Sequence, residues 1–204
     1  EARAVISTGK PDIRQLLCLG WSPDGQLLAT GDSLGTASIW DTQRVLSSRD
    51  ESQRSEDEAL PSENELTTAS ALITSVRLSD CGPINCVAWM PSATGTGEIG
   101  VEQQVAIGCQ KGTIRLHAVT STMVGDSPGE VRRMDHSSAA AVNHCAFTPD
   151  GRNILAVYED GSFKEWPASS SSAAGVASKA VHPGSCHDIA ICSDGGTTMV
   201  SVSS

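Results

Sequence analysis

The sequence is poor in aromatic and basic residues, and both shortages limit what the protein can be. Seven of its 204 residues are Phe, Trp or Tyr, so the core must consist mainly of aliphatic side chains. The 14 Lys and Arg are outnumbered by 24 Asp and Glu, and the net charge of −10 disfavours nucleic-acid phosphates and anionic lipid as main partners. No apolar run approaches the roughly 18 residues that a membrane span needs. We therefore expect a soluble globular protein that binds neither a membrane nor, directly, nucleic acid.

The cysteines lack the spacing of a disulfide framework or a metal site. Their number, seven, is odd, no two form a C-x-x-C pair, and the histidines complete no zinc pattern. The N-terminus has no signal or transit segment. We expect an intracellular protein, cytoplasmic or nuclear, with buried thiols and with no metal, other cofactor or small-molecule substrate.

The most informative feature is an internal repeat. Residues 16–40 read LLCLGWSPDGQLLATGDSLGTASIW, and residues 142–166 read VNHCAFTPDGRNILAVYEDGSFKEW. The two stretches align without a gap, so that Trp40 corresponds to Trp166. Self-similarity at a fixed offset indicates a repeat architecture.

Each copy of the repeat alternates short aliphatic runs with turns that contain glycine. A third copy starts at Ile84 and a fourth near Cys186. Asp-Gly is typical of reversals between antiparallel strands, and the aliphatic runs between such turns predict strands. Further runs between the copies complete four strands per unit, as in a propeller blade. We expect an all-β chain of about three and a half four-stranded blades, with units at about 12–82, 83–135, 136–182 and 183–204.

These residues resemble the WD-repeat (WD40) family, whose repeats carry an S-P-D-G turn and end in Trp-Asp. The matching segments are WSPDG at 21–25, FTPDG at 147–151 and IWD at 39–41. Two such turns, each followed by a Trp at the same offset, make the resemblance specific. It implies a β-propeller. Because propellers of this family commonly close with about seven blades, we expect the chain to be part of a larger, seven-bladed propeller.

The repeats depart from the family in a buried polar set of His, Ser or Thr, Asp and Trp. The third unit has His136, Asp160 and Trp166, but Ala156 occupies the Ser/Thr position. The first unit lacks the Asp, because Leu34 stands in its place. We therefore expect these blades to depend more on aliphatic packing than on that polar set.

The resemblance implies a non-catalytic scaffold that mediates protein–protein interactions within a multiprotein assembly. Partners would dock on loops that rigid blades hold at the rim and faces. The expected contact residues lie in or beside the loops that open the units: Asp12, Arg14, Asp80, Asn85, Asp135, His136, His144, His187 and Asp188. Arg132, Arg133 and Lys164 are basic residues that acids of a partner would meet. The alternative is an RNA-associated WD40 subunit of a ribonucleoprotein complex, whose RNA affinity would fall with salt.

Residues 47–69 form an acidic insertion without hydrophobic periodicity. Its central part, RDESQRSEDEALPSENE, carries seven acids and two bases, a composition that predicts a disordered loop. Ser55 and Ser62 each precede acidic residues and are candidate phosphorylation sites, whereas the plain alternative is a solvated loop without a specific function. Residues 169–178 are rich in Ser and Ala and predict a second flexible loop.

Two motifs have catalytic or cofactor-binding counterparts in other folds. Gly31–Gly35 reads G-D-S-L-G, which would make Ser33 the nucleophile of a hydrolase, the remote alternative. A nucleophile elbow needs a helix after the serine, whereas a strand is predicted there, so we expect a structural turn. Residues 95–100 read G-T-G-E-I-G, but no helix is expected there and no acid lies twenty residues on, so we expect a hairpin insertion. No catalytic residue is predicted.

Overall fold

The structure consists almost entirely of antiparallel β-strands. The computed structural model describes residues 14–44, 71–91, 102–120, 129–169, 176–180, 183–192 and 198–203. Helical conformation in this part of the chain is limited to residues 42–44 and Ala71, beside the outer strands of the first sheet. Several predictions fall outside the described residues and stay predictions: those for Asp12, Ser55, Ser62, the acidic insertion and the motif at 95–100.

Three sheets have four strands each, and in each sheet the strands lie in chain order. The first sheet contains β1 (Leu16–Trp21), β2 (Leu27–Asp32), β3 (Thr36–Asp41) and β4 (Leu72–Arg77). The second contains β5 (Ile84–Trp89), β6 (Gln103–Cys109), β7 (Thr113–Val119) and β8 (Gly129–Asp135). The third contains β9 (Val142–Phe147), β10 (Asn153–Tyr158), β11 (Ser162–Pro167) and β12 (Val176–Ala180). Two further strands, β13 (Cys186–Cys192) and β14 (Thr198–Ser203), pair with each other.

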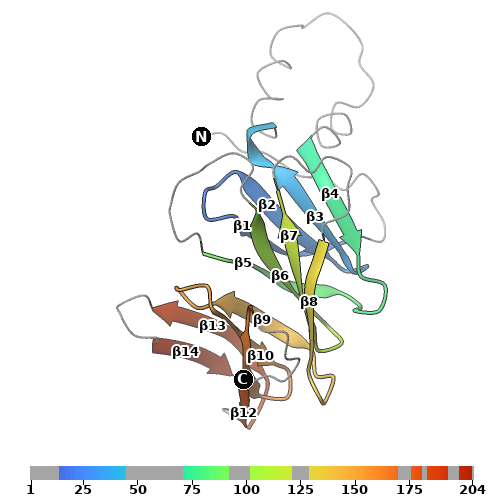
Figure 1. The fold of residues 1–204 in the computed structure, drawn as a ribbon. Coiled ribbons are helices and arrows are strands. Elements are labelled where there is room, and N and C mark those ends of the chain that lie inside the picture. The colour runs from blue at the N-terminus through green and yellow to red at the C-terminus, as the bar shows by residue number, and fades with distance from the viewer. Residues whose placement is uncertain are drawn as a thin grey trace, which may run out of the picture.

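The sheets are arranged as blades of a propeller (Figure 1). The first strands of successive sheets contact one another, β1 with β5, β5 with β9 and β9 with β13, so they form the inner edge of the arrangement. The hydrophobic clusters lie between neighbouring sheets: one joins the second and third sheets, and two join the first and second. The prediction of an all-β, WD40-type propeller segment is confirmed. β12 begins at Val176, so the end of the segment expected to be a loop at 169–178 belongs to a strand instead.

The recurring glycine between the second and third strands is required by its backbone conformation and by close packing. Gly35 and Gly112 have φ of 79° and 75°, a region that favours glycine. A Cβ on Gly35 would lie 2.7 Å from the carbonyl oxygen of Gly82, and one on Gly112 would lie 2.8 Å from the backbone of Ala139. These turns therefore pack directly against the loop that leads to the next sheet.

Candidate interaction surface

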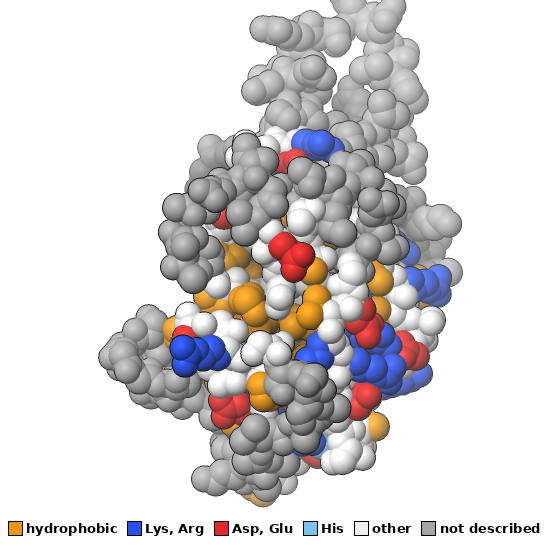
Figure 2. All heavy atoms as spheres, in the orientation of Figure 1, with side chains coloured by type: hydrophobic (Ala, Val, Ile, Leu, Met, Phe, Trp, Pro, Cys, Tyr) orange, Lys and Arg blue, Asp and Glu red, His pale blue; other side chains and the backbone are white. Residues whose placement is uncertain are grey.

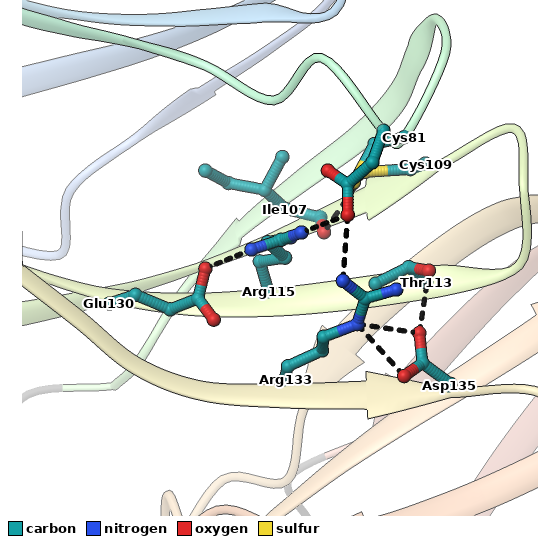
Figure 3. A network of polar contacts seen from close by, with 9 residues as sticks. Cys81, Ile107, Cys109, Thr113, Arg115, Glu130, Arg133 and Asp135 are labelled. Carbon is teal, nitrogen blue, oxygen red and sulfur yellow. Dashed lines mark hydrogen bonds and ion pairs between the residues drawn. The ribbon is translucent and has the colours of Figure 1, made fainter.

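Five charged side chains form a connected group across the second sheet and the loop before it (Figure 3). We refer to Asp80, Arg115, Glu130, Arg133 and Asp135 as the arginine–acid network. Arg115 pairs with Glu130 and, at 2.6 Å between Nη2 and Oδ2, with Asp80. Arg133 donates from Nη1 to the same Asp80 oxygen at 2.7 Å and from Nε to Asp135 Oδ2 at 2.8 Å. The network therefore ties the loop between β4 and β5 to strands β7 and β8.

The register of β7 and β8 explains why Asp80 is needed. Arg115 lies directly opposite Arg133, and Thr113 lies opposite Asp135. Like charges on opposite residues of a strand pair destabilise a sheet. The Asp80 carboxylate accepts from both guanidinium groups and offsets that repulsion. Thr113 adds a hydrogen bond of 2.8 Å from its hydroxyl to Asp135 Oδ1.

The acids of the network are accessible, whereas the arginine between them is largely buried. The Arg115 side chain is 11% exposed, against 48% for Asp80 and 54% for Asp135. Burial would raise the pKa of both carboxyls, but the hydrogen bond that each accepts from Arg133 lowers the pKa below its usual value. Both are therefore ionised at neutral pH. Figure 2 shows basic and acidic side chains gathered at the right of this face, beside hydrophobic side chains in its middle.

Two buried cysteines, Cys81 and Cys109, lie beside this network (Figure 3). Cys81 and Cys109 have no exposed surface. A hydrogen bond from Cys109 and the nearby Arg115 guanidinium lower the pKa of the Cys81 thiol. The Cys81 thiol also lies 3.6 Å from Asp80 Oδ1. The thiols therefore form part of the packing under the charged surface, in agreement with the predicted buried cysteines.

A second group of polar side chains belongs to the third sheet and the loop before it, and all of its members except Asp160 are buried. We refer to His136, Tyr158, Asp160, Ser162 and Trp166 as the His136 network. Trp166 donates from Nε1 to the Tyr158 hydroxyl at 3.1 Å. Ser162 lies 3.0 Å from His136 Nε2 and donates to Asp160 Oδ1 at 2.5 Å.

The His136 network is therefore present, although Ala156 occupies the position where a Ser or Thr was sought. Side chains two residues apart on a strand point to the same side. Tyr158 thus projects from β10 on the same side as Ala156, and its hydroxyl reaches the indole nitrogen of Trp166. Its ring also lies 4.2 Å, centroid to centroid, from that of His136. The sequence analysis did not expect this set of polar contacts, which lies beside a cluster of buried apolar side chains in the same blade; the relative weight of the two stays a prediction.

Comparison with known proteins agrees with this architecture. Residues 8–41 and 129–167 match the family described as "WD domain, G-beta repeat". Two segments of the chain therefore match WD40 repeats. Repeats of this kind, held in a propeller, support a role as a protein-interaction scaffold.

The chain is similar to one curated protein and to one chain of a solved structure. The chain is 24% identical over 165 residues to apoptotic protease-activating factor 1 of Danio rerio, an alignment that covers 73% of this chain and 12% of that protein. The chain thus spans a small part of that relative. It is also similar to a chain in the crystal structure of the mitotic checkpoint complex, with a TM-score of 0.65 and 15% identity over 92% of this chain and 46% of that one. At this identity the likeness shows the fold alone.

In the first WD40 repeat, a buried ion pair involves one of the predicted contact residues. Asp32 is 2% exposed, accepts backbone hydrogen bonds from Leu34 and Thr36, and pairs with Arg14 at 3.2 Å between Oδ2 and Nε. Arg14 therefore serves the fold at the turn after β2. The sequence analysis missed Asp32, because it sought the acid two residues later, at Leu34.

Three further predicted residues bridge neighbouring sheets. Asn85 on β5 donates from Nδ2 to the carbonyl of Val142 on β9 at 3.0 Å. His144 on β9 pairs through Nδ1 with Asp188 on β13. These side chains therefore connect inner strands, and His187 lies exposed between Cys186 and Asp188. Whether any of them contacts a partner stays a prediction.

The basic residues expected to meet a partner's acids already have interactions within the propeller. Arg133 belongs to the arginine–acid network, and Arg132 donates from Nη1 to the carbonyl of Pro167 on the neighbouring sheet. The Lys164 ammonium lies 5.3 Å from the centroid of the Trp166 ring. Among the described residues, the structure brings the predicted contacts Asp80 and Asp135 together in one exposed cluster, and His144 and Asp188 together in another. Arg115 and Glu130 were not predicted, because only the register of β7 and β8 reveals them.

The G-D-S-L-G motif of the first repeat is a turn between two strands. Ser33 follows β2 and precedes β3, and its Oγ accepts a hydrogen bond from the Gln15 amide at 3.1 Å. A nucleophile elbow leads from a strand into a helix, so the expectation of a structural turn is confirmed.

Within the described residues, no group of three or more His, Cys, Asp or Glu side chains could hold a metal ion. The same part of the chain has no helix that is long and apolar enough to cross a membrane.

Proposed function

We propose that this WD40 segment is a non-catalytic scaffold of a multiprotein assembly, and that another protein subunit docks a basic surface on the arginine–acid network. The observation that supports the proposal is that Asp80 and Asp135 are about half exposed while arginines hold them in fixed positions. Binding costs less free energy when the contacting side chains are ordered in advance.

The charge of the network favours a protein partner over a phosphate-bearing one. Three carboxylates and two guanidinium groups give it a net charge of −1. The exposed part carries three acids and one arginine, since Arg133 is 43% exposed whereas Arg115 is 11% exposed. Lys and Arg side chains of a partner would complement such a surface and speed the encounter. The hairpin position of Ser33 supports the non-catalytic part of the proposal.

The test compares two aspartates that have similar contacts and similar exposure. They lie at opposite ends of the strands of their sheets. Asp135, 54% exposed, contacts a threonine and an arginine at the end of β8. Asp150, 55% exposed, contacts Thr148 and Arg152 in the turn between β9 and β10. The full-length protein is purified with its bound subunits, and the affinity of the reconstituted pair is measured for Asp135→Asn and Asp150→Asn.

We expect Asp135→Asn to weaken binding by roughly fivefold, since an exposed charge pair is worth up to about 1 kcal/mol. Raising the salt concentration should reduce the difference between this variant and the parent. Asp150→Asn should bind as the parent does. Equal affinity of Asp135→Asn and the parent would contradict the proposed surface. Co-purification that ribonuclease treatment abolishes would favour the RNA-associated alternative.

A further inference from the structure

Two pairs of cysteine thiols meet in the interior of the described sheets, and their surroundings differ. Cys86 on β5 and Cys145 on β9 bring their sulfur atoms to 3.4 Å from each other, between the second and third sheets. Cys81, in the loop between β4 and β5, shares a buried cluster with Cys109, the last residue of β6. All four are free thiols. The two pairs can therefore be compared as candidate sites of thiol chemistry.

The pair formed by Cys86 and Cys145 lies in mainly apolar surroundings. Its cluster includes Ile114, Met134 and Phe147, and the two cysteines are 6% and 1% exposed. A hydrogen bond with Cys145, together with burial, raises the pKa of the Cys86 thiol well above its usual value. Because the thiolate is the reactive form of cysteine, this pair serves packing and resists oxidation.

The pair formed by Cys81 and Cys109 has a guanidinium group beside it (Figure 3). The ion pairs of Arg115 with Asp80 and Glu130 hold that group in place. A hydrogen bond with Cys109 and the guanidinium of Arg115 lower the pKa of the Cys81 thiol, although burial opposes them. The hydrogen bond between the thiols raises the pKa of Cys109. Cys81 therefore ionises first, and a thiol next to a positive charge is the kind that reacts.

The position of Cys81 in a loop gives a small reagent a route to it. Its neighbour Asp80 is 48% exposed, so Cys81 lies one residue beneath the surface. Its amide donates to the Leu78 carbonyl at 3.0 Å, and its carbonyl accepts from the Lys111 amide at 3.2 Å. Loops open at a lower free energy than core strands do. Cys81 is thus reached by local opening, whereas Cys86 is reached only when strand β5 separates from its sheet.

We infer that Cys81 and Cys109 form an oxidation site, a dithiol that hydrogen peroxide converts into a disulfide. The disulfide would tie the loop that carries Asp80 to the end of β6. The geometry that carries the inference is the contact of two thiols in one cluster, beneath a loop and beside a fixed guanidinium group. This inference does not depend on the proposed function.

The reaction proceeds in two steps. The Cys81 thiolate attacks one oxygen of hydrogen peroxide, so that an S–O bond forms, the O–O bond breaks, and the departing hydroxide takes up a proton and becomes water. The thiolate of Cys109 then attacks the Cys81 sulfur, so that the S–S bond forms and the S–O bond breaks, with release of a second water molecule. In total, two electrons pass from the two thiols to one hydrogen peroxide, which is reduced to two water molecules.

Disulfide mapping of the full-length protein tests the inference without any substitution. The reduced protein is treated with hydrogen peroxide, its remaining thiols are alkylated after unfolding, and linked peptides are identified by mass spectrometry. Chymotrypsin is suitable, because trypsin does not cleave between Arg77 and Lys111, whereas cleavage after Trp89 separates Cys81 from Cys109.

We expect the link between Cys81 and Cys109 to form while Cys86 and Cys145 are still recovered as alkylated thiols. Equal rates for the two pairs would overturn the inference. So would linkage that appears only in denaturant, or a Cys81 disulfide that joins two molecules.

Two matched substitutions test the role of the guanidinium group. Arg115→Gln and Arg133→Gln each remove one arginine from Asp80, but Arg133 has its other contact with Asp135. Arg115→Gln should slow disulfide formation by roughly fivefold, because less of the Cys81 thiol is ionised. Arg133→Gln should react as the parent does. Equal rates for the two variants would overturn the assignment of Cys81 as the attacking thiol.

Removal of the second thiol gives a further measurement. In Cys109→Ala, hydrogen peroxide should leave Cys81 as a sulfenic acid, which the reagent dimedone labels. Cys145→Ala is the control, and it should retain the link between Cys81 and Cys109. Absence of a label on Cys81 in folded Cys109→Ala would overturn the inference. If Cys109→Ala does not fold, the mapping of the parent protein decides the question.

Discussion

The two polar networks of this chain use similar hydrogen-bond distances in opposite surroundings. In the His136 network, Tyr158 and Trp166 are 0% and 1% exposed, so their hydrogen bond has no competition from water. In the arginine–acid network, Asp80 and Asp135 are about half exposed. A buried donor that loses its acceptor cannot turn to solvent, whereas an exposed carboxylate can. The first network should therefore stabilise the blade, and the second should be available for recognition.

Removing the Tyr158 hydroxyl should give the largest effect. Tyr158→Phe would leave Trp166 Nε1 buried without its acceptor and should lower the free energy of unfolding by about 1–3 kcal/mol. Urea unfolding measures this loss, and the midpoint should fall without a change in slope. Thr30→Val is the parallel variant, since Trp40 donates to Thr30 Oγ1 at 2.9 Å in the first sheet. A Tyr158→Phe protein as stable as the parent would show that the buried hydrogen bond contributes little.

A smaller effect is expected from protonation of His136. Burial, and next the positive charge of Lys164, lower the pKa of His136 in the folded protein. The unfolded state therefore takes up the proton first as the pH falls. The stability contributed by the neutral ring is complete above the ordinary histidine pKa of about 6.5 and is lost as the pH falls through the lowered value.

Unfolding titrations between neutral and mildly acidic pH can isolate this contribution. His136→Gln should make the free energy of unfolding less dependent on pH in this window than it is in the parent. His144→Gln provides a control for loss of a histidine from the same sheet, because the His144 side chain is 38% exposed. An unchanged pH dependence in His136→Gln would show that the buried ring does not set the acid sensitivity of the blade.

The smallest change in stability is expected in the exposed network. Asp135→Asn should alter the free energy of unfolding by no more than about 0.5 kcal/mol, because solvent screens its pairing with Arg133. The same urea measurement applies. A loss as large as that of Tyr158→Phe would mean that the arginine–acid network is mainly a structural connection between sheets, which would weaken the proposed docking surface.

The sequence predicted the elements of this fold because their signals are local. An Asp-Gly turn is recognised from adjacent residues, and Gly25 and Gly151 both have the positive φ, 70° and 69°, that such turns require. The alignment of the two best repeats also placed Trp40 and Trp166 in similar surroundings, each bonded to a hydroxyl on the second strand of its sheet. Periodic patterns therefore sufficed for strand order and blade equivalence.

The sites were less predictable, because they depend on pairing between distant segments. Arg115 and Arg133 lie opposite each other only through the β7–β8 register, and Asp80 joins them from the preceding loop. Tyr158 replaces an expected Ser or Thr because its longer side chain reaches Trp166 from a neighbouring position. Such substitutions preserve a contact without preserving the residue pattern that a sequence search follows.

The amino-acid order alone determined that this chain forms repeated four-stranded sheets with glycine at their corners, since turns and strands depend on neighbouring residues. Only the tertiary structure decided which side chains are buried and which face solvent, as where Trp21 on β1 is 57% exposed and its counterpart Trp89 on β5 is 8% exposed among the described residues. The reason is physical: burial is set by the sheet that packs alongside, and the sequence of a strand does not specify its neighbour.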